Sequence, residues 1–217
     1  MHWRAFAERP VVVPATGRRG PGAAERPVAP MSAEPDDPLD AALRLARALE
    51  GRGIAYAIGG ALAYGLWAVP RATVDVDVNV FAGEEDLEAV FAILASTGVR
   101  FDAGAARAQN ERDGMFVGRW GIYRIDVFTP SIDFAWEAER TRVRHEIGGS
   151  SAWFLSAEAI AVFKLLFFRA KDLVDLERLV ALRSELDVAY VRRQIVAMMG
   201  ESDERVEKWD QIVRAVR

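Results

Sequence analysis

The alternation of apolar and polar residues is sharpest at residues 74–80. This stretch reads Val-Asp-Val-Asp-Val-Asn-Val, and its period of two predicts a β-strand with one apolar face. Asp75 and Asp77 then lie on the same face, about 6.6 Å apart along the strand. Aspartate is uncommon in strands, and two like charges side by side repel each other. We therefore expect a cation between these carboxylates or in front of them.

Apolar residues at helical spacing predict helices on both sides of this strand. Asp37 and Pro38 begin the first helix, and Gly51 ends it. Gly121 marks a hairpin turn. In this first half we expect strands at 54–58, 74–80, 115–120 and 122–128, and helices at 61–67, 84–97 and about 131–142.

In the second half of the chain the pattern predicts helices only. Ser156 begins a strongly apolar helix that reaches Arg169. Further helices are expected over about 171–184, 187–199 and 202–216, with Asp187 and Ser202 as N-caps and Gly200 as a stop.

This order of elements predicts an α+β fold. A small mixed β-sheet core over 37–150 precedes a helical region over 151–217, which closes a cleft. Residues 1–36 are rich in Pro, Gly, Ala and Arg without periodicity. We expect them to be disordered or loosely attached, with Met31 as an alternative start of translation.

Composition excludes several classes of site. The chain has 217 residues, no cysteine and a formal net charge of -4, which excludes disulfides and argues against broad nonspecific binding to nucleic acid. No apolar run approaches the roughly 20 residues of a membrane span, so we expect a cytoplasmic protein without membrane contact. Basic residues do cluster locally, either as solvated helix faces or as a nucleic-acid contact. They are Arg140, Arg142, Arg144, His145, Arg192 and Arg193.

The Gly59-Gly60 pair stands between a predicted strand and a predicted helix. Bare backbone N–H groups at such a helix start are a common way to hold phosphate. Carboxylates for a divalent metal and a glycine turn for phosphates together indicate chemistry on a nucleoside triphosphate. The pair alone is weak evidence, because it lacks the Lys-Ser/Thr of a P-loop.

A third carboxylate, Asp126, stands between two apolar residues in a later strand. If that strand neighbours 74–80, Asp126 joins Asp75 and Asp77 in a site for two magnesium ions, as phosphoryl or nucleotidyl transfer requires. The alternative is a surface strand with Asp126 facing solvent beside Arg124.

Lys164 lies in a helix that is apolar almost all round. A buried ammonium without a partner is costly, so Lys164 should contact an anion. That anion is either a triphosphate or an internal partner, Asp172 or Asp175, which share one helix face. Lys171 belongs to the same charged segment, which is more often a solvated face.

The pattern Gly-Gly, then Arg-x-Thr-x-Asp-x-Asp, then a later strand Asp resembles the DNA polymerase β-type nucleotidyltransferase superfamily. The run from Lys164 to Asp175 is similar to that of the AbiEii-type toxin nucleotidyltransferases, which include the MenT toxins. The resemblance covers about residues 37–185. One departure is that many members have Gly-Ser where this chain has Gly59-Gly60. The lost hydroxyl removes one phosphate or metal contact but leaves the backbone donors.

The resemblance implies an enzyme that moves a nucleoside monophosphate from a nucleoside triphosphate to an acceptor hydroxyl and releases pyrophosphate. It implies Mg²⁺ as cofactor, the 3′ end of a tRNA as acceptor, and a separately encoded antitoxin as partner. The implied metal ligands are Asp75, Asp77 and Asp126, with Lys164 as a further catalytic residue. The implied nucleotide contacts are Gly59, Gly60, Arg71, Thr73, Lys164, Lys171, Asp172 and Asp175.

Two other functions stay open. One is a small-molecule nucleotidyltransferase of the antibiotic-modifying kind, which an enclosed acidic pocket would favour. The other is a nucleotide-binding or antitoxin-binding module without activity, which a misplaced Asp126 would favour. Arg71 and Thr73 either steady the triphosphate or only shape their loop.

Overall fold

A computed structural model describes residues 34–217. The predictions for Met31 and for nearly all of the 1–36 segment therefore fall outside the described residues. Asp36, at the end of that segment, contacts the folded body, because its carbonyl accepts a hydrogen bond of 3.0 Å from the Tyr123 hydroxyl. Its backbone N–H also donates to Asp40 at 3.0 Å.

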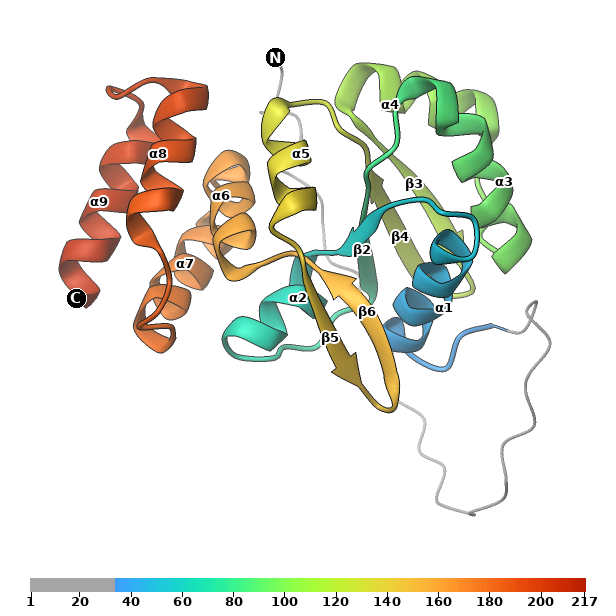
Figure 1. The fold of residues 1–217 in the computed structure, drawn as a ribbon, viewed down its shortest axis with the longest axis horizontal. Helices are drawn as coiled ribbons and strands as arrows, with labels where there is room; N and C mark the ends of the chain where they lie inside the picture. Colours follow the sequence, from blue (N-terminus) through green and yellow to red (C-terminus); the bar gives the residue numbers. More distant parts are fainter. Residues whose placement is uncertain (1–33) are drawn as a thin grey trace.

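The predicted α+β class is confirmed in the described chain (Figure 1). The elements are α1 (Pro38–Glu50), β1 (Tyr56–Ile58), α2 (Gly60–Trp67), β2 (Asp75–Val80), the 3₁₀ turn η2 (Glu84–Asp86), α3 (Leu87–Thr97), α4 (Ala103–Asp113), β3 (Met115–Trp120), β4 (Tyr123–Phe128), α5 (Asp133–Arg140), β5 (Val143–Ile147), β6 (Ser150–Phe154), α6 (Ala157–Phe167), α7 (Ala170–Leu182), α8 (Val188–Met199) and α9 (Glu204–Val216).

The strands of the described residues form one mixed sheet in the order β3-β4-β2-β1-β6-β5. The central strand β2 pairs antiparallel with β1 and parallel with β4. β6 pairs parallel with β1, so the sheet continues past residue 150, where we expected the helical region to begin. The boundary between the two regions therefore lies after Phe154.

The alternation in β2 gives the sheet two different faces. Val76 and Val78 are buried on one face, which α1 covers, with α3 packed against α1 and α4 against β3. Asp75 and Asp77 lie on the other face. Figure 1 shows α2, α5 and α6 on that side of the sheet. A second set of helices therefore lies over part of the acidic face.

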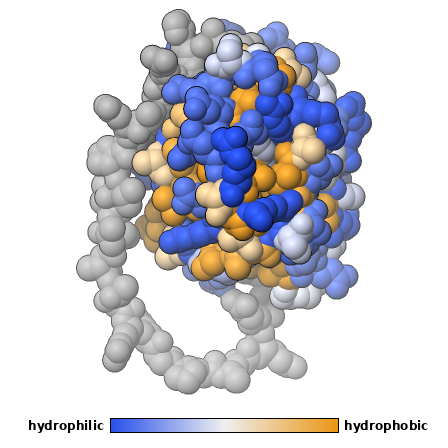
Figure 2. Space-filling model, turned by 90° about the vertical axis from the view of Figure 1, so that its left-hand side faces the viewer, coloured by the Kyte–Doolittle hydropathy of each residue, from blue (hydrophilic) through white to orange (hydrophobic). Residues whose placement is uncertain are grey.

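The C-terminal helices pack on one another, with α6 in contact with α7, α8 and α9. Leu165, Leu176, Ile195 and Trp209 are buried between them. Figure 2 shows the side of the molecule that these helices form, where apolar residues emerge among hydrophilic ones. None of the helices in 34–217 has both the length and the apolar character needed to cross a membrane.

Several local predictions need correction. The helix α4 was not predicted, because its residues are mostly polar and only Ala106 is buried. The strands β5 and β6 were not predicted either; four of the five residues of β5 are exposed, so its sequence has no buried alternation. Asp203 rather than Ser202 caps α9, accepting from the Arg205 N–H at 2.9 Å. The other predicted caps, Asp37, Ser156 and Asp187, are confirmed.

Candidate active site

The acidic residues of the sheet come together on the β2–β4 strand pair. The parallel register places Asp77 opposite Asp126 and Asp75 opposite Arg124. The strand of Asp126 thus neighbours 74–80, which was the condition for Asp126 to approach Asp75 and Asp77. Asp75 is exposed at the start of β2, whereas Asp77 lies deeper. Two carboxylates, Asp77 and Asp126, thus stand side by side on adjacent strands.

Asp77 shows the electrostatic consequence of this placement. Burial, and then the negative charges of Asp126 and Asp75, raise the pKa of Asp77 to about 7. The positive charges of Arg169 and Lys171 act in the opposite direction. Near neutral pH Asp77 is therefore divided between its protonated and ionised forms. A cation placed beside it would favour the ionised form.

Asp126 has a partner on its own strand. Arg124 Nε donates to Asp126 Oδ1 at 2.7 Å, and the Asp126 side chain is only 16% exposed. Asp126 thus lies beside Arg124, as the alternative interpretation expected, but it faces Asp77 rather than open solvent.

The predicted three-carboxylate site is not preformed. Across residues 34–217, no group of three or more Asp, Glu or His side chains is arranged to hold a metal ion. In the strand pair, Asp75 lies at the exposed end of β2, and Arg124 donates to one oxygen of Asp126.

The Gly59-Gly60 turn lies directly against Asp77. The Gly59 N–H donates to the Asp77 carbonyl at 2.8 Å, and Gly60 begins α2 with a φ of +53°. A Cβ at Gly60 would stand 1.8 Å from Asp77 Oδ2, and one at Gly59 would stand 2.7 Å from Asn79 Nδ2. The close approach of the turn to the carboxylate therefore requires glycine.

Lys164 has the internal partners that the sequence left as an alternative. Its Nζ lies 2.6 Å from Asp175 Oδ2 and 3.3 Å from Asp172 Oδ1. All three residues are buried. Lys164 also lies over the Tyr64 ring, 5.0 Å from its centroid. These contacts satisfy the ammonium without a ligand, and they leave its role toward a nucleotide a prediction.

Further basic residues surround the two buried carboxylates. Arg169, just before α7, donates to Asp172 at 2.6 Å, and Asp172 caps the start of the helix in return. Lys171 is exposed in the first turn of α7; partial desolvation and the neighbouring charge of Arg169 lower its pKa. Arg71 lies 3.2 Å from Asp175. The cluster of Arg71, Lys164, Arg169 and Lys171 against Asp172 and Asp175, here called the basic cluster, carries more positive than negative charge.

Arg71 and Thr73 differ in what they contact. Arg71 reaches the basic cluster from the loop between α2 and β2 and stacks on Tyr64, 5.9 Å from the ring centroid. Thr73 Oγ1 accepts from the Asp75 N–H at 3.1 Å, a contact that shapes the loop. The contact of Thr73 supports the interpretation that it shapes the loop, whereas Arg71 lies where it could contact an anion.

Sequence reasoning assigned no role to three residues of this region. Arg169 was considered only as part of the run after Lys164. Its hydrogen bonds to Asp172 could not be predicted from spacing alone. Tyr64 donates to the Asp175 carbonyl at 3.2 Å and joins α2 to α7. Arg124 was noticed only as a neighbour of Asp126, because its pairing depends on strand geometry.

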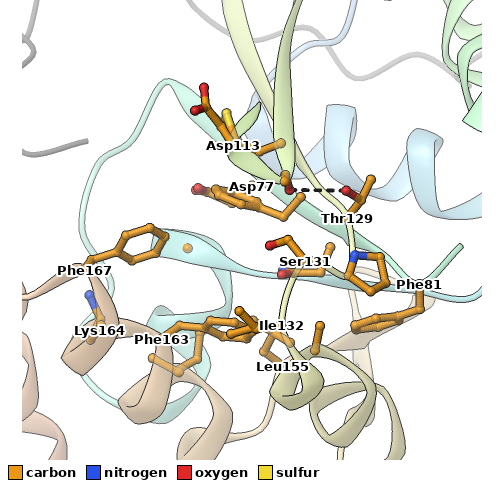
Figure 3. A pocket seen from close by; sticks show the side chains of 18 of the residues that line it. Asp77, Phe81, Asp113, Thr129, Ser131, Ile132, Leu155, Phe163, Lys164 and Phe167 are labelled. Atoms are coloured by element: carbon orange, nitrogen blue, oxygen red, sulfur yellow. Dashed lines mark hydrogen bonds between the residues drawn. The ribbon is translucent and has the colours of Figure 1, made fainter. Parts of the chain in front are cut away.

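A pocket opens from the acidic face toward α5 and α6 (Figure 3). Gly60, Asp77, Lys164 and Arg169 line its charged part. The remaining wall is mostly aromatic and aliphatic. It includes Phe81, Phe128, Ile132, Leu155, Phe163 and Phe167.

The chain's similarity to known proteins is found among solved structures. No protein-family model matches it, and no curated protein matches it. Among solved structures, the antibiotic-resistance factor ANT(2'')-Ia is similar over 79% of this chain and 86% of its own, with 20% identity and a TM-score of 0.44. An antigenic nucleotidyltransferase-like protein from Paracoccidioides brasiliensis is similar over 81% and 94%, with 18% identity and a TM-score of 0.49. JHP933 from Helicobacter pylori is similar over 85% and 95%, with 14% identity and a TM-score of 0.38. At these scores the likeness carries no argument about function, which has to come from the site itself.

Proposed function

We propose that the protein is a metal-dependent nucleotidyltransferase. The observation that supports this best is the position of Asp77, which stands beside Asp126 across parallel strands and against the Gly59-Gly60 turn. The basic cluster lies next to it, since Arg169 and Lys171 act on the Asp77 charge. Paired carboxylates, a glycine turn at a helix start and an excess of positive charge are what a triphosphate with its metal ion requires.

The carboxylates fit a divalent cation such as Mg²⁺. Mg²⁺ prefers oxygen ligands and is commonly held by one or two carboxylates together with substrate phosphates and water. Asp77 and Asp126 supply two carboxylates, and Asp75 is a third candidate. The absence of a preformed three-residue group in 34–217 is consistent with a site that the triphosphate completes. When bound, the ion would neutralise phosphate charge and favour deprotonation of the acceptor hydroxyl.

The remaining residues bind and orient the triphosphate. The Gly59-Gly60 turn places the N-terminus of α2 beside the proposed phosphate position, and Arg71, Lys164 and Lys171 supply positive charge. In the reaction, the acceptor oxygen forms a bond to the α-phosphorus while the bond to the bridging oxygen breaks. Pyrophosphate leaves, and the hydroxyl proton passes to solvent.

The resemblance implies a tRNA acceptor and an antitoxin, and a cleft rimmed by free arginines would favour the tRNA acceptor. Each arginine considered for this rim is already paired with an acidic residue. The pairs are Arg140–Glu137, Arg142–Glu139 at 3.0 Å, Arg144–Glu50 at 3.3 Å and Arg192–Asp210 at 3.0 Å. Each rim arginine is balanced by a carboxylate, whereas the basic cluster has four positive and two negative charges, so the rim offers little net charge to RNA phosphates. This favours a small-molecule acceptor over tRNA.

The test is transfer of label from each of the four α-³²P nucleoside triphosphates with MgCl₂, with total tRNA and with pooled small-molecule extracts. Triphosphate binding is measured in parallel by calorimetry, since it does not require the acceptor. Asp77→Asn should abolish transfer. Asp133→Asn, the same chemical change at an exposed position on α5, should not. A wild-type protein that neither binds triphosphate nor transfers label would contradict the proposal.

A further inference from the structure

The pocket on the acidic face has two parts of opposite character. Two of its charged residues lie next to α2. Asp77 is close to Gly60, and Lys164 lies over the Tyr64 ring. From Asp77 the lining continues along β2 to Phe81, about 13 Å away at the usual strand rise. We call this second part, lined by Phe81, Phe128, Ile132, Leu155, Phe163 and Phe167, the apolar chamber.

The walls of the apolar chamber are held in place by ring contacts. Phe163 packs edge-on against Phe134 with centroids 5.4 Å apart, and Phe128 packs against Phe167 at 6.2 Å. Phe128, Phe163 and Phe167 are nevertheless only half-buried. Aromatic surface that stays accessible inside a walled pocket is typical of a binding site for an apolar group.

The chamber offers few hydrogen-bonding groups to a ligand. Thr129 Oγ1 donates to Asn110 at 2.8 Å, and Asn79 Nδ2 contacts the Ala57 carbonyl at 3.5 Å. A nucleobase is read by several hydrogen bonds to its edge, and a site without them selects for apolar surface instead. Ser131, which points into the chamber in Figure 3, adds one hydroxyl to this short set of hydrogen-bonding groups.

The same chamber is unsuited to a polycationic sugar. Besides Asp77, two acidic residues line the pocket: Asp113 is paired with Arg112 at 2.7 Å, and Asp172 with Arg169 at 2.6 Å. A ligand with several ammonium groups would need free carboxylates to replace the water that it loses.

We infer that the acceptor of the proposed transfer is a small molecule with a largely apolar, ring-containing body that carries a hydroxyl. The body fills the apolar chamber, and the hydroxyl is directed toward Asp77, where the α-phosphate would lie. The inference rests on the proposed nucleotidyltransferase function, because it uses the same site.

The first test is binding of 2-naphthalenemethanol, a fluorescent apolar alcohol, to the full chain with and without ATP and MgCl₂. Saturable binding that ATP does not displace is expected, because the two ligands occupy different parts of the pocket. Tobramycin, as a polycationic probe, should not compete.

Two variants on α5 locate the binding site. Ala135 lines the chamber and is 7% exposed, so Ala135→Leu fills space without removing a wall and should weaken probe binding at least about tenfold. Trp136 is 41% exposed on the same helix, and Trp136→Leu should leave probe affinity unchanged. Thermal melts confirm that both variants are folded, and both should bind ATP as the wild type does.

Three results would overturn the inference: no saturable probe binding, equal binding by the two variants, or displacement of the probe by ATP. Displacement by ATP would assign the chamber to the nucleobase. Intact ATP binding with no probe binding removes only the acceptor assignment, whereas loss of ATP binding in the wild type removes the proposed function itself.

Discussion

Lys164 Nζ lies 2.6 Å from Asp175 Oδ2, at the point where α6 packs against α7. Arg71 also reaches Asp175, at 3.2 Å, and thereby joins the loop before β2 to the helical region. Asp175 is thus shared by Lys164 within the helical region and by Arg71 from the first half of the chain, and the Arg71 contact joins the two halves. A ligand that draws Lys164 or Arg71 toward its phosphates has to compete with this pairing.

Lys164→Met should destabilise the protein. The change leaves Asp172 and Asp175 buried without the ammonium they share, and loss of one member of a buried ion pair costs about 3–5 kcal/mol. The lower end is expected, because Arg169 still contacts Asp172 and Arg71 still contacts Asp175. Urea unfolding measures the loss.

The double variant Lys164→Met/Asp175→Asn separates the ion pair from simple packing. Removing the uncompensated carboxylate should restore a large part of the lost free energy of unfolding. A single variant that is as stable as the wild type would mean that the pair contributes little. Triphosphate binding by the double variant then reports whether Lys164 also serves the ligand.

Asp77 should make stability depend on pH in an unusual direction. Its pKa is raised to about 7 in the folded protein, so the folded state holds a proton that the unfolded state has already released. Stability should therefore fall as pH rises from about 4 to about 7, on the order of 1.4 kcal/mol per unit of pKa shift.

Asp77→Asn isolates this contribution, because all other titrating groups remain. The unfolding free energies of wild type and variant are measured in urea at pH values from 4 to 8. The variant should become more stable relative to the wild type as pH rises across that window. Parallel profiles would show that the Asp77 pKa is not raised. Added Mg²⁺ should flatten the wild-type slope if the ion binds the ionised carboxylate.

Much of the fold could be predicted from local patterns, because β2 and the helix caps are encoded by neighbouring residues. The period of two in β2 and the cap residues Asp37, Ser156 and Asp187 each act within a few positions. The helix α4 was missed because Ala106 is its only buried residue, so no apolar stripe marks it.

The candidate site could be predicted only in part, because its pairings depend on strand register and helix packing. Asp77 and Asp126 come together through a parallel register between distant strands. That Arg124 would pair with Asp126, or that Lys164 would find both Asp172 and Asp175, follows from side-chain geometry that spacing does not fix. Residues from both halves of the chain line the apolar chamber, so no single segment of the sequence predicts it.

Arg124→Gln should strengthen the binding of a divalent cation. Arg124 Nε occupies Asp126 Oδ1 at 2.7 Å, and a metal ion must compete with that charge-assisted hydrogen bond. Releasing the carboxylate should raise affinity for Mg²⁺, or for Mn²⁺ as a spectroscopic probe, by about tenfold, since hydrogen bonds to charged groups contribute about 1.5 kcal/mol or more.

Arg119→Gln is the matched control for this measurement. Arg119 lies opposite Arg124 on β3 and is exposed, so its loss removes the same formal charge without freeing Asp126. Mn²⁺ titration followed by electron paramagnetic resonance compares the two. Equal affinities for both variants would show that only the change in net charge matters and that Asp126 is not a ligand.

Gly60→Ala should disturb both the fold and the site. The residue has a φ of +53°, and an added Cβ would stand 1.8 Å from Asp77 Oδ2, so backbone strain of about 1–2 kcal/mol adds to a clash with the carboxylate.

Gly65→Ala, in the interior of the same helix, has no positive φ and would place its Cβ 3.4 Å from Pro70. It should be neutral or stabilise by up to about 1 kcal/mol. In the double variant Gly60→Ala/Asp77→Ala the clashing oxygen is gone, and part of the loss should return in thermal and urea melts. A Gly60→Ala protein as stable as Gly65→Ala, with unchanged triphosphate affinity, would mean that the turn does not press against Asp77 and does not shape the proposed phosphate site.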